Sequence, residues 1–358
     1  MSYIVVKEKV LREYIQEVLV KAGIEVEGAK IIADTLVEAD LRGIDTHGVV
    51  RLAVYYLKRI KKGLILKHPK YKVIKKSRST AIIDADKGPG QVVTLKAIRL
   101  AMEIAKETGI GLVGVKNSSH FGIAAYFAME ALKEDMIGIA LTQADARVAP
   151  FGARKAYIGT NPFSVAIPSY KKPPVVLDMA TSAISMGKII FGAKKGEKIP
   201  RGVAIDEQGQ VTTDPNKVVA LLSSGGPKGS GLAIIIDILC GILMESSFGP
   251  HINFGDDFTK PELLAHLVGA INISFFTSVD RFKRRVDQMI EEIKDLPPCN
   301  GTSEVFLPGE KEFKTKKERI EKGIPIAKEI FSELQGLEDC YIKDFEEKNT
   351  FEFYRSKG

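Results

Sequence analysis

The chain has 358 residues and a net charge of +7, with 45% hydrophobic and 27% charged residues. This composition excludes a generally disordered chain, and at about 100–200 residues per domain the length predicts two domains. The three cysteines, Cys240, Cys299 and Cys340, are isolated and offer neither a disulfide framework nor the spacing of a metal site, which suits a reducing cytoplasm.

Two segments bear on targeting and membranes. The opening residues, MSYIVVKEKVLREY, become charged after a short apolar stretch, so no signal peptide is expected. The apolar run from Gly231 to Met244 is too short to span a bilayer and is interrupted by Asp237, which favours a buried helix. We therefore expect a cytoplasmic protein with no membrane span.

The net positive charge favours an anionic partner, either nucleic acid or a small polyanion such as a nucleotide together with a carboxylate. Basic residues are spread through mixed-sign segments such as KEKVLREY and EEKNTFEFYRSKG, without a long basic block or interleaved aromatic residues. A Walker-A lysine motif is also missing from the sequence. We therefore expect a small anionic ligand and no nucleic acid.

The predicted elements change in character along the chain. Residues 7–41 favour two amphipathic helices with a break at Ala22 and Gly23, and residues 49–63 favour a third. From Tyr71 onward, short β-type runs alternate in part with helical stretches at 91–107 and 123–134, which is an α/β pattern. The β-type runs are YKVI, TAIIDAD, GLVGVK, MIGIALT, FSVAIP and VVLDMA.

The last third of the chain is predicted to be mainly helical. A helix is expected over 230–245, an amphipathic helix over 280–296, and two more within 316–337 around Pro325, whereas 262–278 is ambiguous. The C-terminal helices are expected to rejoin the N-terminal ones. This predicts a helical domain from residues 1–70 together with about 300–358, and an α/β domain over 71–299.

The stretch GIGLVG, Gly109 to Gly114, matches the glycine pattern of a Rossmann dinucleotide site. That pattern indicates a dinucleotide site only when a strand precedes it and a helix follows it, because the N-terminus of the helix binds the phosphates. Here, residues 95–108 before it have helical spacing and IGLVGVK after it resembles a short buried strand. We expect Gly109 to end a helix, so a bound dinucleotide would lie elsewhere.

His47 is a candidate acid-base group, because the imidazole pKa lies near neutrality. It lies on a predicted connection beside Thr46 and one turn before Arg51. An arginine can grip the carboxylate of a 2-oxoacid bidentately while an imidazole protonates the carbonyl. Spacing alone leaves open the alternative that His47 caps the following helix and Arg51 forms a surface ion pair.

Four further segments place small polar or basic groups where a ligand could bind. His120 follows two serines at a predicted strand-to-helix junction, where free amides could contact an anion or where the helix is simply capped. Lys228 lies among Gly225, Gly226, Gly229 and Gly231 before a long apolar helix, which favours a phosphate site over a glycine turn that serves only helix packing. Residues 158–168 and 177–188 place small polar residues beside apolar strands.

Seven motifs follow one another in a fixed order: ADLRGIDTHGVVR, NSSHFGIAAY, VAPFGA, GTNPFSVA, LDMATS, GGPKGSGL and LPGE. Together they resemble the type-2 malate/L-lactate dehydrogenase family over about residues 34–325. That family includes archaeal malate and sulfolactate dehydrogenases, ureidoglycolate dehydrogenase, diketogulonate reductase and cyclic imino-acid reductases. The resemblance implies an NAD(P)-dependent oxidoreductase and a homodimer. It also implies a non-Rossmann α/β domain with a mixed sheet, which binds cofactor and substrate, beside a helical domain.

The resemblance also implies roles for single residues. It assigns the proton donor to His47, the neighbouring hydroxyl to Thr46 where serine is usual, and the substrate arginine to Arg51. No metal is required. Contacts with NAD or NADP fall on His120, Phe121, Gly122, Ile123, Ala124, Thr160, Asn161, Asp178, Met179, Ala180, Lys228, Gly229, Pro308, Gly309 and Glu310.

The chain departs from the family pattern in several places. Gln143 stands where asparagine is common, Ala153 replaces a second glycine, and LLSSGG lacks the Pro-Phe often seen before the glycines. Residues 244–275 and the tail after Leu337 match nothing in the pattern. These departures leave open which acid is the substrate and how the far wall of the cofactor site is formed, but they do not change the reaction class. Whether NAD or NADP is preferred is also left open by the sequence.

The expected reaction is reversible hydride transfer between a nicotinamide and a small 2-hydroxy or 2-oxo acid. Malate with oxaloacetate, or sulfolactate with sulfopyruvate, are the first candidates. The alternative within the enzyme class is reduction of a cyclic imine or a diketo sugar acid, or turnover of ureidoglycolate, on the same scaffold. A non-catalytic polyanion-binding protein is the alternative from another class.

Overall fold

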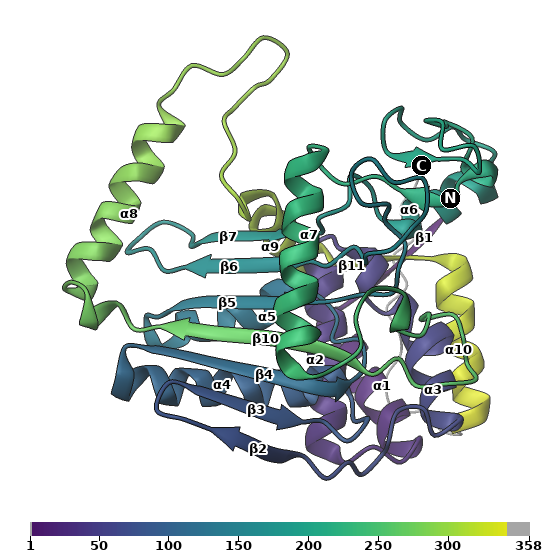
Figure 1. Ribbon diagram of the computed structural model, residues 1–358, viewed down its shortest axis with the longest axis horizontal. Coiled ribbons are helices and arrows are strands. Elements are labelled where there is room, and N and C mark those ends of the chain that lie inside the picture. The colour runs from purple at the N-terminus through teal and green to yellow at the C-terminus, as the bar shows by residue number, and fades with distance from the viewer. Residues whose placement is uncertain (1, 342–358) are drawn as a thin grey trace.

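A seven-stranded sheet forms the centre of the computed structural model, which describes residues 2–341 (Figure 1). Its order is β2-β3-β4-β10-β5-β6-β7; β3 and β4 are parallel and the other neighbouring pairs are antiparallel. The predicted α/β class with a mixed sheet is confirmed. The strands are β2 (Lys72–Lys76), β3 (Thr80–Asp84), β4 (Ile110–Ser118), β5 (Ile137–Thr142), β6 (Phe163–Ile167), β7 (Val175–Met179) and β10 (Leu264–Ile271).

The central strand β10 comes from the segment whose secondary structure was ambiguous in the sequence. It lies between β4 and β5, and its residues from Leu264 to Ala270 are buried. A strand that is covered on both faces has no alternation of apolar and polar residues, so its pattern does not distinguish it from a buried helix.

Helices cover both faces of the sheet. In Figure 1, α4 (Gly90–Thr108) and α5 (Ala124–Ala128) lie behind it and α7 (Pro227–Cys240) crosses in front. Gly109, with φ of 82°, ends α4, and β4 begins at the next residue, so the predicted helix-to-strand turn at GIGLVG is confirmed. A Cβ on Gly111 would lie 2.0 Å from the Ala101 carbonyl oxygen, so this glycine lets α4 pack closely on the sheet.

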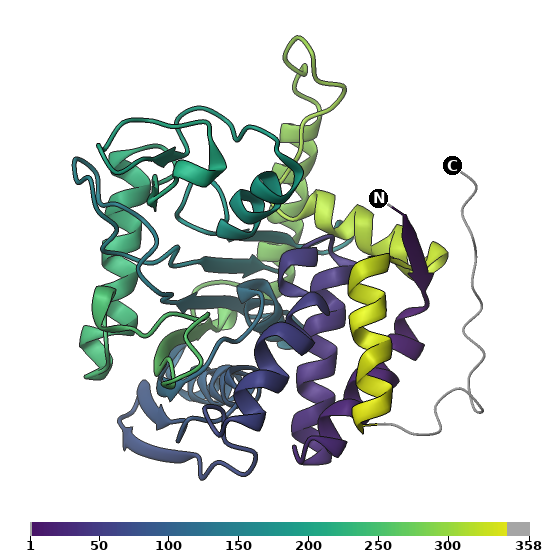
Figure 2. The same ribbon diagram turned by 90° about the vertical axis from the view of Figure 1, so that its right-hand side faces the viewer.

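The N-terminal and C-terminal segments lie together, as predicted. Helices α1 (Glu8–Lys21), α2 (Val26–Leu41) and α10 (Lys328–Tyr341) are neighbours in Figure 2, and β1 (Tyr3–Val6) pairs antiparallel with β11 (Ile324–Ala327). Their buried side chains, including Ile15, Leu36 and Leu334, continue into the core that α4 forms with the sheet. The division into two domains stays a prediction.

Several predicted helices differ in detail from the observed ones. The third one begins as a π-helix over Leu52–Leu57 and continues as α3 (Lys58–Lys61). Pro325 lies in β11, which separates α9 (Glu310–Lys322) from α10. The amphipathic helix α8 (Val279–Lys294) stands at the side of the molecule, and the short elements α6 (Met186–Lys195), β8 (Ala204–Ile205) and β9 (Ala220–Leu221) form a small lobe (Figure 1).

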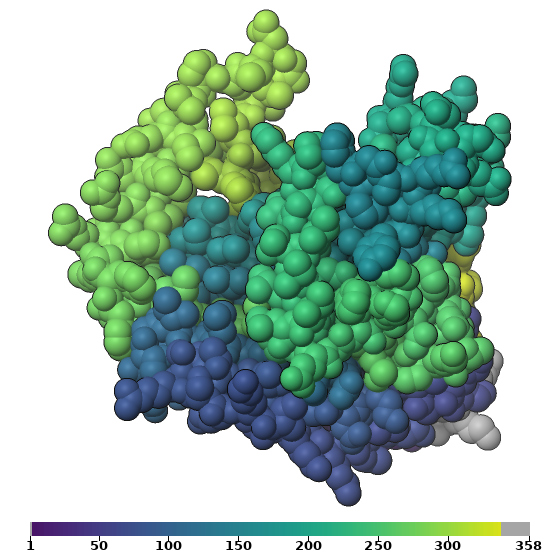
Figure 3. Space-filling view, in the orientation of Figure 1, coloured from purple at the N-terminus to yellow at the C-terminus, as the bar shows by residue number. Residues whose placement is uncertain are grey.

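The apolar run from Gly231 to Met244 forms a helix through Cys240, as predicted, but the prediction that this helix is buried holds only in part. Ile236 and Cys240 of α7 are buried with Ala265 and Leu267 of β10, but Ile235 is 54% exposed, and Leu243, in the 3-10 turn after the helix, is 57% exposed. Figure 3 shows this helix as a column on the molecular surface. The 18 residues from Pro227 to Met244, with mean hydropathy 1.6, are by length and composition long enough to cross a membrane, and 44% of this stretch is buried inside the protein.

Candidate active site

The sheet topology brings separate segments to one edge. Ser118 at the end of β4 pairs with Leu264 at the start of β10, and Thr142 at the end of β5 pairs with His266. Phe163 at the start of β6 pairs with Met179 at the end of β7. The polar segments that follow or precede these residues therefore meet at the same end of the sheet, next to the N-terminal helices (Figure 1).

The loop after α2 holds the predicted proton donor. Residues Asp45–His47 form a 3-10 turn in which the Thr46 hydroxyl lies 2.9 Å from His47 Nδ1. Arg51 Nε donates to the Thr46 carbonyl at 2.8 Å, and Arg51 forms no ion pair among the described residues. The three predicted residues are thus together, and the Thr46 contact leaves His47 Nε2 and the terminal nitrogens of Arg51 for a ligand.

The charge of this group is concentrated on Arg51. Burial, and after it the nearby Arg51 guanidinium, lowers the pKa of His47 from its ordinary 6.5 to about 4. The imidazole is therefore neutral at neutral pH while Arg51 stays charged. A neutral imidazole beside a guanidinium suits the binding of a carboxylate anion.

His120 lies against His47, as two sequence segments that are 73 positions apart come together. Their ring centroids are 5.6 Å apart with an interplanar angle of 27°. The Tyr56 hydroxyl lies 2.7 Å from His120 Nδ1, which orients the ring. Burial, followed by the charges of His47 and Arg51, lowers the pKa of His120 well below its ordinary value. Two neutral imidazoles therefore face one guanidinium.

A buried network that the sequence did not predict lies behind His120. The Tyr55 hydroxyl donates to Glu262 and accepts from the His120 backbone amide. Burial raises the pKa of Glu262 to about 7, against lowering by Arg59 and by the Tyr55 hydrogen bond. The Arg59 guanidinium lies 5.0 Å above the Tyr55 ring and donates to the backbone carbonyls of Phe254, Gly255 and Asp257. Arginine or tyrosine at positions 51, 55 and 59, one helical turn apart, was the available signal.

The segments predicted to contact the cofactor are linked by hydrogen bonds. The Thr181 amide donates to the Thr160 carbonyl at 2.9 Å, and the Ser224 amide donates to the Thr181 carbonyl at 2.8 Å. At the start of α5, the Ala125 amide donates to Asp178 Oδ2 at 3.2 Å. These three bonds connect the strand ends, the glycine-rich turn and the His120 segment.

The last predicted cofactor segment, residues 308–310, lies beside β7, the strand that contains Asp178. The Val176 amide of this strand donates to the Pro308 carbonyl at 3.0 Å. A Cβ on Gly309 would lie 2.8 Å from the Val176 carbonyl oxygen, so glycine is required for this approach. Glu310 pairs with Lys294 at 2.8 Å and accepts from the Leu307 amide. Its carboxylate therefore joins α8 to α9.

Some of the residues predicted to contact the cofactor are buried, and their side chains bond or pack within the protein. The buried Asn161 amide group donates to the Ala233 carbonyl and accepts from the Ala144 amide. Phe121 is buried and stacks on His266 at 4.7 Å, and a Cβ on Gly229 would lie 2.1 Å from the Ser224 carbonyl oxygen. Gly122, Ile123 and Ala124 are buried as well, whereas Thr160, Asp178, Met179 and Ala180 are partly exposed.

The start of α7 fits a nucleotide phosphate. Gly225 and Gly226 have positive φ angles of 63° and 61°, and Lys228 is exposed in the first turn without an ion pair among the described residues. The buried Ser223 hydroxyl beside this turn has no hydrogen-bond partner within residues 2–341. Helix amides, a free cation and an unsatisfied hydroxyl are the groups that a phosphate would use.

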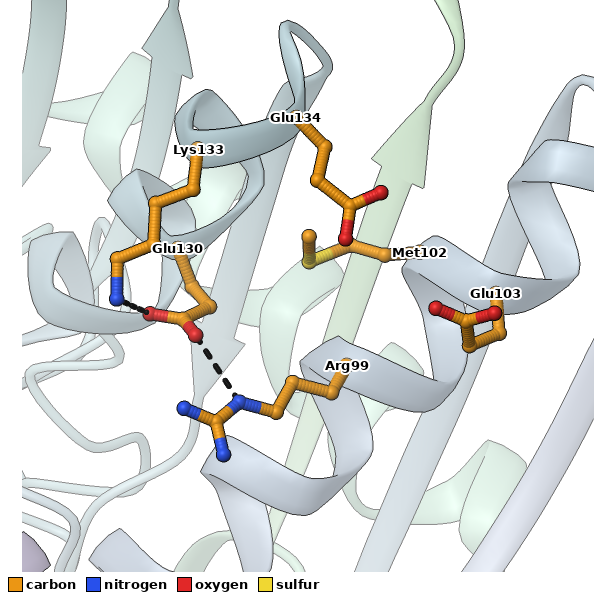
Figure 4. Close-up of a pocket in the computed structure, with 6 residues that line it drawn as sticks. All are labelled: Arg99, Met102, Glu103, Glu130, Lys133 and Glu134. Carbon is orange, nitrogen blue, oxygen red and sulfur yellow. Dashed lines mark hydrogen bonds and ion pairs between the residues drawn. The ribbon is translucent and has the colours of Figure 1, made fainter.

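A groove between α4 and residues 130–134 is lined by none of the residues of the candidate active site. It has a volume of about 190 Å³ and is lined by charged side chains together with Met102 (Figure 4). Glu130 pairs there with Arg99 at 3.0 Å and with Lys133 at 2.6 Å. Glu103 and Glu134 pair with Lys106, so the charges of the groove are paired, and it contains none of the predicted site residues.

Comparisons with known proteins identify the family of the chain. The family model for malate/L-lactate dehydrogenase matches residues 6–335. The chain is 42% identical to a malate dehydrogenase of Pyrococcus abyssi over 346 residues, which cover 94% of each chain. It is 34% identical to a ureidoglycolate dehydrogenase of Escherichia coli O157:H7 over 347 residues, which cover 97% of this chain and 99% of the relative.

Solved structures give the same result. The sulfolactate dehydrogenase of Methanocaldococcus jannaschii superposes with a TM-score of 0.89 at 39% identity, over 95% of this chain and 99% of that one. The expected enzyme class, a 2-hydroxyacid dehydrogenase, is thereby confirmed over the non-catalytic alternative. The chain belongs to the malate/L-lactate dehydrogenase family.

Proposed function

We propose that the protein interconverts a small 2-hydroxy acid and its 2-oxo acid, with malate/oxaloacetate or sulfolactate/sulfopyruvate as the pair. The observation that carries this proposal is the group of Thr46, His47 and Arg51 with His120 stacked against it. The names of the relatives, malate dehydrogenase and sulfolactate dehydrogenase, support this class of acid.

Arg51 binds the carboxylate of the acid in this proposal. Its Nε is held by the Thr46 carbonyl, so the terminal nitrogens are left to donate to two carboxylate oxygens. A substrate held in this way has its C2 oxygen beside the two imidazoles. In reduction, His47 Nε2 donates a proton to that oxygen, and in oxidation the neutral imidazole accepts it.

The low pKa of His47 connects proton donation to substrate binding. Arg51 contributes to the lowering, and a bound carboxylate offsets the Arg51 charge. Binding of the oxoacid therefore raises the pKa of His47 and favours the imidazolium that reduction needs. Thr46 keeps the ring oriented during both directions of the reaction.

We infer that the cofactor is NAD or NADP, which supplies or accepts the hydride when it is bound. Lys228 and the start of α7 would hold a phosphate, and the partly exposed residues Thr160, Asp178, Met179 and Ala180 would line the rest of its path. This site differs from a Rossmann site, since GIGLVG follows a helix and enters a strand. The α/β domain thus carries a non-Rossmann cofactor site.

We also propose that the protein is a cytoplasmic homodimer. The exposed apolar face of α7, with Leu232, Ile235 and Ile238, continues into Leu243 of the following 3-10 turn and supports association with a second copy, because water-exposed apolar patches favour burial. Analytical ultracentrifugation of the wild type and of Ile235→Glu tests it. A monomeric wild type would contradict the homodimer.

The test of the proposed reaction is a panel of oxoacids assayed with NADH and NADPH, combined with His47→Asn. Loss of general acid-base catalysis lowers turnover by about 10²–10⁴-fold. The exposed His68, which pairs with Glu25, gives a matched control in His68→Asn. Turnover of His47→Asn within about threefold of wild type would contradict the role of His47.

A further inference from the structure

The loop that holds His47 is closed at its base by a buried carboxyl group. Asp40, in the last turn of α2, is 4% exposed, and its Oδ2 accepts from the Val49 backbone amide at 2.9 Å. Val49 follows the loop, so this hydrogen bond joins the residue before the loop to the residue after it. The bond also caps an amide at the start of the next helix.

Gly48 fits against this carboxyl group. A Cβ at Gly48 would lie 1.8 Å from Asp40 Oδ1 and 2.2 Å from its Cγ. The carboxyl group therefore occupies the volume that a side chain at position 48 would need. Since Gly48 directly follows His47, the position of the Asp40 carboxyl group limits where the His47 backbone can lie.

The outer side of the loop is held by α9. Arg319 donates to the Asp40 backbone carbonyl and forms an ion pair with Asp45 at the start of the 3-10 turn. A Cβ at Gly43 would lie 3.1 Å from the Thr315 methyl group, so α9 also packs closely on the first part of the loop. The loop is thus fixed by Asp40 on its inner side and by Arg319 on its outer side.

We propose, on the basis of the proposed function above, that Asp40 is a positioning residue that fixes the imidazole of His47 for proton transfer. Asp40 acts through the Val49 amide and the contact with Gly48, without touching the substrate. Burial raises the pKa of the Asp40 carboxyl well above its usual range, so the position needs a hydrogen-bond acceptor of this shape more than a negative charge. An asparagine side chain has the same shape and keeps a carbonyl acceptor.

The first experiment compares Asp40→Ala with Asp40→Asn. A misplacement of about 1 Å costs on the order of 10²-fold in rate, so we expect kcat of Asp40→Ala to fall by about that factor. The Kd for NADH and the KM for the oxoacid should change by less than about threefold, because Lys228 and Arg51 are untouched. Asp40→Asn should recover kcat to within about threefold of wild type.

Leu36→Ala is the matched control, since Leu36 is fully buried in the same helix and its loss lowers the melting temperature without touching the loop. Its kcat should stay within about twofold of wild type. If Asp40→Ala lowers the melting temperature to the same extent and keeps its kcat, Asp40 is only structural and the proposal is overturned. Failure of Asp40→Asn to recover kcat overturns it as well.

A second readout does not depend on turnover. Gly48→Ala should displace the Asp40 carboxyl group, and NMR of the His47 imidazole should then show its pKa moving from about 4 toward the ordinary 6.5 as the loop opens to water. An unmoved pKa in folded Gly48→Ala would overturn the positioning role. If this pKa moves while His47→Asn keeps wild-type turnover, Asp40 still fixes the His47 loop, and it is the proposed role of His47 in proton transfer that fails.

Discussion

Replacing Arg51 by lysine tests the carboxylate site directly. Lysine keeps the positive charge, but it loses the planar pair of donors and the hydrogen bond from Nε to the Thr46 carbonyl. A hydrogen bond to a charged group contributes about 1.5–3 kcal/mol, and each 1.4 kcal/mol changes an affinity tenfold. We therefore expect the KM for oxaloacetate to rise by about 10- to 100-fold.

The same change should leave the proton donor nearly intact. Arg51 contributes to the low pKa of His47 through its charge, and lysine retains a charge at this position. The kcat should accordingly fall much less than the affinity for the oxoacid, and the KM for NADH should stay the same. Steady-state rates at varied oxoacid and saturating NADH separate these quantities.

Two comparisons make the result specific. Arg99→Lys is the matched control, since Arg99 pairs with Glu130 in the groove of Figure 4, away from the site residues. Pyruvamide in place of pyruvate removes the carboxylate from the ligand, so the cost of Arg51→Lys should largely disappear with the amide. An unchanged KM for oxoacids in Arg51→Lys would place the carboxylate site elsewhere.

Two further predictions concern the cofactor and pH. Lys228→Ala should raise the Kd for NADH or NADPH by about 10- to 100-fold in a protein that melts normally, whereas Gly111→Ala, whose Cβ would lie 2.0 Å from a carbonyl oxygen, should lower the melting temperature and leave that Kd unchanged. If fluorescence titrations and melts instead show weaker cofactor binding for Gly111→Ala and unchanged binding for Lys228→Ala, then GIGLVG is the cofactor site. The pH prediction concerns His266, because burial lowers its pKa to about 3. Below pH 6.5 the unfolded chain therefore binds a proton that the folded protein does not, and the protein loses stability as the pH falls. The variant His266→Asn lacks this group, so between pH 7 and pH 5 its unfolding free energy should fall by about 2 kcal/mol less than that of the wild type, as measured by urea titrations. An equal fall in both proteins would contradict the prediction.

Local signals in the sequence predicted the elements whose chemistry is local. Gly109 ends α4 because the helical spacing stops there and glycine adopts a positive φ without strain. The group of Thr46, His47 and Arg51 was also within reach, because all three residues lie within six positions of one another. Residues this close in the sequence lie close in space in almost any fold.

Long-range contacts could not be predicted in this way. Glu262 reaches Tyr55 across 207 positions, and no spacing rule connects an acidic residue before one strand with a tyrosine in a distant helix. The strand that follows Glu262 was ambiguous for a related reason, since burial on both faces removes the periodicity. The exposed face of α7 was missed because composition reports how apolar a helix is and not how much of it the rest of the chain covers.

The place of β10 in the sheet determines when the protein can finish folding. The strands β4 and β5 come early in the chain, but the strand that joins them is made of residues 264–271. Until the ribosome has released that segment, the nascent chain holds two partial sheets whose inner edges have unpaired amides and carbonyls. Such edges pair readily with other chains, so aggregation through strand edges is most favoured in the interval between synthesis of β5 and of β10.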